Sequence, residues 1–94
     1  MIIVRETFIA KPGMASKLAK LMKEAMDSVP MGKARILTDL VGNFNTVVVE
    51  TELNNLGDFE RRMEEYRNDT KFHAKMSGYT DLYVSGKREI YQIH

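Results

Sequence analysis

Hydrophobic and polar positions along the chain follow two periods, one typical of strands and one typical of helices. Residues 2–9 are rich in β-branched and aromatic side chains and predict a first strand, which a turn at 11–13 ends. Across residues 14–29 apolar side chains recur at steps of three and four, opposite a lysine-rich side. This spacing predicts an amphipathic helix of about four turns. Pro30 and Gly32 are expected to stop it.

The middle of the chain predicts a hairpin followed by a second helix. Residues 34–41 and 44–53 have the composition of strands. Gly42-Asn43 lies between them, and because both residues tolerate positive φ, a tight turn is expected there. Apolar side chains then recur at helical spacing through residues 56–67. Asn55 is a suitable N-cap for that helix.

The last third of the chain predicts a further helical segment and a final strand. Asn68-Asp69-Thr70 interrupts the second helix, and Asp69 or Thr70 can cap the helical piece that follows. That piece extends toward residue 84, with Gly78 making it irregular. Ser85-Gly86 is expected to break it before residues 87–93 form the last strand. The predicted order is βαββαβ with one extra helical segment.

This order predicts a single α+β domain over residues 1–94, of ferredoxin-like type. Its simplest fold is a four-stranded antiparallel sheet with the helices on one face. Right-handed crossovers place the first and third strands in the centre. A sheet with one bare face should alternate apolar and polar residues, but Ile2-Ile3-Val4 and Val47-Val48-Val49 do not. We therefore expect a second copy to cover the other face, giving a homodimer.

The amino-acid composition argues against several classes of function, among them nucleic-acid binding and metal binding. The net charge is only +1, which is unlike the strongly basic surface of nucleic-acid binders. No apolar stretch is long enough to span a membrane or to form a signal sequence. The chain has no cysteine, so disulfides and thiolate metal sites are excluded, and a cytoplasmic location is expected. Two histidines without a carboxylate cluster predict no metal site, and no cofactor motif is present.

The turn and strand patterns together resemble the dimeric α/β-barrel superfamily, in which two ferredoxin-like protomers pack sheet to sheet. The similarity covers essentially the whole chain and is closest to the NIPSNAP-like and antibiotic-biosynthesis-monooxygenase-like branches. The segments that carry it are Phe8 to Gly13, the hairpin around Gly42, Val47 to Glu50 with Leu53, and Ser85 to Tyr91.

Two departures from the relatives limit what the resemblance implies about activity. The charged-x-Arg-x-Tyr pattern associated with the NIPSNAP first strand falls on Val4, Glu6 and Phe8, so only the aromatic residue is kept. The haem-degrading relatives use an Asn on the first strand, a His and a Trp, whereas this chain has no Trp and no Asn before Asn43.

His73 is the best single candidate for catalysis. An imidazole beside aromatic residues can act as a general base near neutral pH or orient a phenolic substrate. Asp69 is the only carboxylate close enough in sequence to orient it. A histidine on a solvent-facing helical turn is the alternative. The residues expected to bind a ligand beside it are Tyr66, Phe72, Met76 and Tyr83, although tyrosines also close cores with the hydroxyl at the rim.

Charged residues within the strands need partners if both sheet faces are covered. Since the first and third strands should be neighbours, we expect an ion pair between Arg5 and Glu50, with a structural rather than a catalytic role.

Three functions remain open from the sequence. The first is binding of a small apolar or aromatic molecule in a cleft between sheet and helices. The second is a cofactor-independent monooxygenase or isomerase acting on a quinol-type or aromatic substrate. The third is a structural or regulatory dimerisation module.

Overall fold

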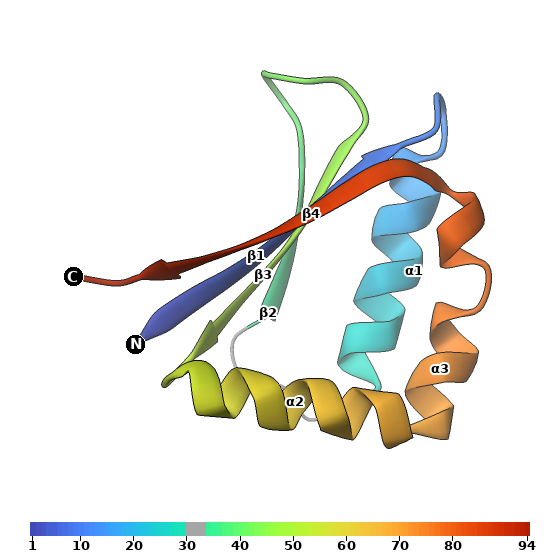
Figure 1. Ribbon diagram of the computed structural model, residues 1–94. Coiled ribbons are helices and arrows are strands. Elements are labelled where there is room, and N and C mark those ends of the chain that lie inside the picture. Colours follow the sequence, from blue (N-terminus) through green and yellow to red (C-terminus); the bar gives the residue numbers. More distant parts are fainter. Residues whose placement is uncertain (30–33) are drawn as a thin grey trace.

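A computed structural model describes residues 1–29 and 34–94, so the predicted helix stop at Pro30 and Gly32 lies outside the described residues. The strands are β1 (Ile2–Ala10), β2 (Ala34–Thr38), β3 (Thr46–Leu53) and β4 (Tyr83–Gln92). The helices are α1 (Ala15–Asp27), α2 (Leu56–Asn68) and α3 (Thr70–Met76), followed by a 3-10 turn at Tyr79–Asp81 (Figure 1).

The four strands form one antiparallel sheet in the order β2-β3-β1-β4. This confirms the ferredoxin-like fold with the first and third strands in the centre. Figure 1 shows α1 and α3 side by side against one face, while α2 runs across their lower ends. We call this side of the sheet the inner face, and the side away from the helices the open face.

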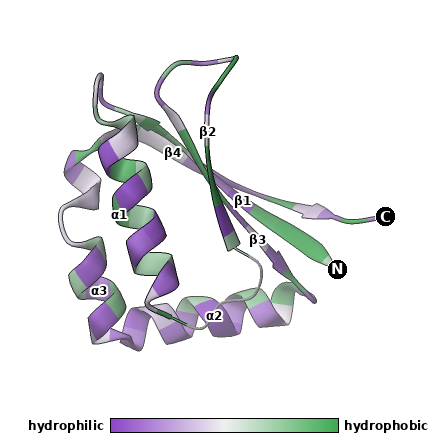
Figure 2. Ribbon diagram, turned by 180° about the vertical axis from the view of Figure 1, so that it is seen from behind, coloured by the Kyte–Doolittle hydropathy of each residue, from purple (hydrophilic) through white to green (hydrophobic). Residues whose placement is uncertain are grey.

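The core lies between the inner face and α1. Leu18 and Met22 of α1 and Val47 of β3 are fully buried, and Figure 2 shows hydrophobic segments on both α1 and the strands. In the valine run of β3, Val47 and Val49 are buried whereas Val48 is only partly covered. Since successive strand residues point to opposite faces, Val48 lies on the open face.

The connection between β2 and β3 differs from the predicted tight turn. The last pair of the ladder is Thr38 with Val47, so a loop over residues 39–45 joins the two strands. The Asp39 carboxylate accepts a hydrogen bond from the Thr46 amide at 3.0 Å, which favours a wider loop over continued pairing. The loop projects beyond the end of the sheet (Figures 1 and 2). Three large apolar side chains on it are almost fully exposed: Leu40, Val41 and Phe44.

The last strand also begins earlier than the sequence indicates. Ser85-Gly86 was expected to break the chain, but both residues lie inside β4 and pair with β1. A shift of register at Ile9/Ala10 lets β4 start at Tyr83. Gly86 packs closely against β1, because a Cβ at this position would lie 3.1 Å from the ring of Phe8.

Both predicted helix caps are confirmed. The Asn55 side chain accepts a hydrogen bond from the Asp58 amide, and the Asp69 carboxylate accepts one from the Phe72 amide, each at 2.9 Å. Asp69 therefore separates α2 from α3 and lets the chain turn through the corner visible in Figure 1. This corner places the aromatic residues of α2 and α3 opposite the inner face.

Candidate functional site

A cavity of about 220 Å³ lies between the inner face of the sheet and the three helices. Most of its lining is apolar or aromatic, with a few charged groups among the rings and thioethers. Sites for small molecules commonly combine these features. The lining residues come from β1, β3, β4, all three helices and the 3-10 turn: Glu6, Phe8, Met22, Met26, Val49, Met63, Tyr66, Arg67, Phe72, His73, Met76, Tyr79 and Arg88.

Most residues proposed from the sequence meet in this cavity. Tyr66, Phe72, Met76 and His73 all line it. The rings of Tyr66 and Phe72 stack with centroids 4.8 Å apart, so α2 and α3 present one aromatic wall. Tyr83 is not part of the lining: its ring packs beside Tyr79 at 5.8 Å, toward the end of the core.

His73 lies on α3 at the exposed edge of the cavity. Its Nε2 is 3.0 Å from the backbone carbonyl oxygen of Arg67. Because a carbonyl only accepts, Nε2 carries the hydrogen in this contact, and Nδ1 holds the lone pair of the neutral ring. Asp69, proposed to orient the imidazole, instead directs its carboxylate to the Phe72 amide. The imidazole is thus held by a backbone group.

A charged pair on the inner face was missed by sequence reasoning. Glu6 of β1 lies directly opposite Arg88 of β4, and the Arg88 guanidinium donates to the Glu6 carboxylate at 3.3 Å. The guanidinium also sits over the ring of Phe59, 5.2 Å from its centroid. Strand parity could have indicated the position of Glu6, because it lies two residues from both Val4 and Phe8, which face the helices.

Two tyrosine hydroxyls beside the cavity stay protonated at neutral pH. Burial raises the pKa of Tyr66, the charge of Arg62 opposes this rise, and that of Glu6 adds to it. The Tyr66 hydroxyl oxygen is buried and has no hydrogen-bond partner of good geometry among the described residues. Burial likewise raises the pKa of Tyr79. Neither phenol therefore adds charge to the cavity.

The open face carries a different cluster, centred on Glu50. Its carboxylate accepts hydrogen bonds from Arg5 Nε at 3.0 Å and from Arg35 Nε and Nη2 at 3.0 and 2.5 Å. The predicted pair of Arg5 and Glu50 is confirmed, and Arg35 extends it to a triad. The hydrogen bonds from Arg35 are the main reason that the pKa of Glu50 is lowered. The carboxylate and both arginines of this triad are thus paired with one another.

Residues 1–29 and 34–94 contain no group of three or more histidine, aspartate or glutamate side chains placed to hold a metal ion. None of the helices in this part of the chain is long and apolar enough to cross a membrane.

The fold is that of the NIPSNAP and antibiotic biosynthesis monooxygenase structures, as the resemblance in the sequence suggested. An uncharacterized NIPSNAP domain protein from Burkholderia xenovorans superposes with a TM-score of 0.85 at 13% identity, covering 100% of this chain and 95% of its own. A NIPSNAP family protein from Agrobacterium tumefaciens gives 0.85 at 17% identity, with coverages of 97% and 90%. A structure described as an antibiotic biosynthesis monooxygenase gives 0.73 at 12% identity, with coverages of 100% and 99%.

The sequence itself matches no protein-family model and no curated protein. At these identities the structural similarity shows a shared fold, and activity has to be argued from the cavity.

Proposed function

We propose that the protein binds a small, largely apolar or aromatic molecule in the cavity between the inner face and the helices. The observation that carries this proposal is that apolar and aromatic side chains from every layer of the fold converge on one cavity of about 220 Å³. Such a volume is far larger than that of the methyl-sized gaps that a close-packed core tolerates. Filling it with a ligand would restore the contacts that its lining lacks.

The chemistry of the lining supports an aromatic guest. Met22, Met26, Met63 and Met76 surround the space with flexible, polarizable thioethers, which adapt to the shape of a guest and contact ring edges favourably. The stacked rings of Tyr66 and Phe72 add aromatic surface to the same lining.

A cavity-filling variant tests this proposal. The neutral bicyclic amide 1-naphthamide is titrated into the native protein and into Met63→Trp, and calorimetry measures its affinity for each. The tryptophan replaces the methionine side chain with a bulky ring system that fills the cavity. Leu56→Trp is the matched control, because Leu56 lies on the same helix but is 58% exposed. We expect binding to be lost in Met63→Trp and kept in Leu56→Trp. Equal binding by both variants, or no binding by the native chain, would refute the proposal.

We further propose that the protein works as a homodimer joined through the open face. Apolar side chains lie on that face with only partial cover, among them Ile3, Ile9 and Val48, and Leu37 is 39% exposed. The loop over residues 39–45, with its exposed apolar side chains, projects beyond the end of the sheet, where a second copy could also cover it. A second copy seated there would remove all of these groups from water, which is the main driving force for association.

A second candidate function is cofactor-independent oxygenation, and the position of His73 in the cavity lining favours it. Nδ1 could take a hydroxyl proton from a bound quinol, and the resulting anion could reduce O₂. With naphthalene-1,4-diol, one oxygen atom enters the ring to give 2-hydroxy-1,4-naphthoquinone and the other leaves as water. Oxygen uptake above the uncatalysed background that disappears in His73→Ala would support this function. Oxygen uptake equal to background would contradict oxygenation, and ligand binding would remain as the proposed function.

A further inference from the structure

We infer that the cavity selects molecules that join an aromatic body to an anionic head such as a carboxylate. This inference deepens the proposed binding function and rests on it. It follows from which charged groups face the cavity and from how Arg88 is held there.

The charged side chains that line the cavity are unequal in sign. Arg67 of α2 and Arg88 of β4 are cationic, whereas Glu6 of β1 is the only carboxylate in the lining. Arg62 of α2 lies close by, in a smaller adjoining space that Glu6 also borders. The site therefore has an excess of positive charge.

Arg88 is the group best placed to receive an anion. Its position is fixed on two sides, by the Glu6 carboxylate and by the ring of Phe59. Its contact with Glu6 uses Nη2 alone, at a distance of 3.3 Å, which is at the long end for a charged hydrogen bond. A guanidinium carries several N–H donors in a planar fork that matches a carboxylate. Its side chain is 46% exposed, so the fork is accessible to an incoming head group.

Other ligand charges fit the site less well. A cationic head would meet the arginines and would have to compete with Arg88 for Glu6. A neutral head would leave the field of Arg67 and Arg88 unused. An anionic head meets opposite charge on two elements, while Phe8, Phe72 and the methionines surround the aromatic body.

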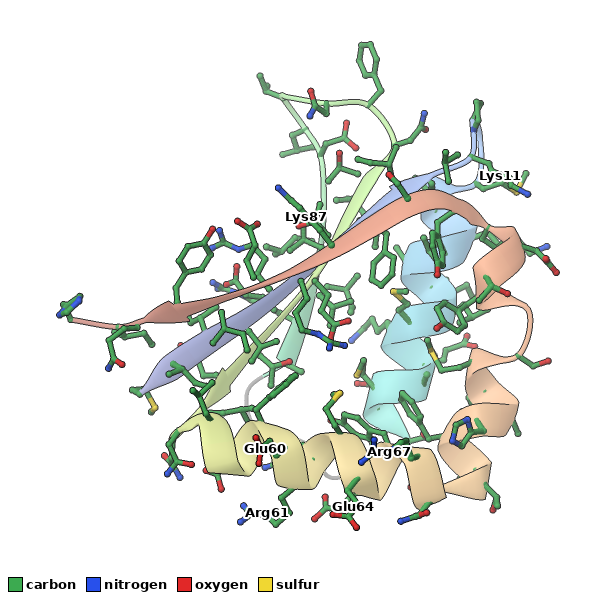
Figure 3. The ribbon with its side chains drawn as sticks, in the orientation of Figure 1. Lys11, Glu60, Arg61, Glu64, Arg67 and Lys87 are labelled. Carbon is green, nitrogen blue, oxygen red and sulfur yellow. The ribbon has the colours of Figure 1, made fainter. Side chains whose placement is uncertain are left out.

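The test compares 1-naphthoate with 1-naphthamide, which have nearly the same shape but differ in charge. We expect the native protein to bind naphthoate at least about tenfold more tightly, as one charge-assisted hydrogen bond provides. Arg88→Gln should abolish this preference, and Arg88→Lys should restore part of it. Arg61→Gln is the matched control, because Arg61 points away from the sheet on the outer side of α2 (Figure 3). It should keep the full preference.

Glu6→Gln distinguishes an anion site from a merely structural ion pair. If the pair only supports the fold, both Glu6→Gln and Arg88→Gln should weaken naphthoate binding. If Arg88 receives the anion, removal of the Glu6 charge should strengthen naphthoate binding, and the two variants should act in opposite directions. Equal affinity for amide and carboxylate would overturn the anion preference and leave the proposed cavity function intact. No binding of either compound would overturn both.

Discussion

Replacing Glu50 with glutamine should destabilise the protein in a pH-dependent way. The side chain of Glu50 is only 6% exposed, and its carboxylate accepts three hydrogen bonds from two arginines. Charge-assisted bonds of this kind contribute about 1.5–3 kcal/mol when fully buried, but exposed ion pairs contribute only about 0–1 kcal/mol. The Arg5 and Arg35 side chains are 41% and 67% exposed. We therefore expect the free energy of unfolding to fall by about 1–2 kcal/mol, which lowers Tm by about 5–10 °C for a chain this short.

The pH dependence follows from the lowered pKa of Glu50. Because its pKa is lower in the folded than in the unfolded state, the carboxylate stabilises the fold above its ordinary value of 4.5. That contribution is lost as the pH falls from 4.5 through the folded-state pKa. The Tm difference between the native chain and Glu50→Gln should therefore be constant near neutral pH and shrink in acid.

Thermal unfolding followed by circular dichroism between pH 3 and 8 measures both effects. Glu64→Gln is the control, since Glu64 is exposed on α2 and points away from the sheet (Figure 3). It should change Tm by no more than about 2–3 °C, as expected for a surface change. A Tm difference for Glu50→Gln that is absent, or that is unchanged down to pH 3, would refute the reasoning.

Three further outcomes are expected. Val48→Asp, on the open face, should convert the proposed dimer to a folded monomer, whereas Val47→Asp, in the core, should unfold the chain. Sedimentation at micromolar concentration measures this, and a native chain that sediments as a folded monomer would contradict the dimer. His73→Ala should change Tm by less than about 3 °C, because its one hydrogen bond is exposed; a fall of about 10 °C would make it a core residue. Asp69→Ala should speed amide exchange across α3, which has no fully buried residue, and leave α1 protected; equal acceleration in both helices would show that they open together.

The fold was predictable because local signals agreed with each other. The helical period of α1 and the caps at Asn55 and Asp69 need only neighbouring residues to be interpreted. The crossover rule then fixed the centre of the sheet, which in turn paired Arg5 with Glu50.

The features of the fold that could not be predicted depend on how the strands pair, residue by residue. The loop over residues 39–45 forms because Asp39 binds the Thr46 amide, although the strand-like composition around it continues. The early start of β4 depends on a shift of register opposite Ile9, which no local pattern marks. For the same reason Arg88 was not recognised as a cavity residue: its partner, Glu6, is 82 positions away in sequence.

The candidate site was predictable only in part. Phe72, His73 and Met76 lie on one short helix, so their proximity follows from sequence spacing, and Tyr66 reaches them because the Asp69 cap turns α3 back toward the end of α2. Tyr83 keeps that spacing, but Gly78 adopts positive φ and ends the helical period before it. Its ring therefore packs outside the cavity.

The central claim is that a small aromatic molecule occupies the cavity between the inner face and the helices. A crystal soaked with 1-naphthoate tests it most directly. We expect density for the bicyclic ring between Phe8, Phe72 and Tyr79, with the carboxylate within hydrogen-bonding distance of Arg88. An empty cavity at a saturating concentration, or density only on the open face beside Glu50, would contradict the claim.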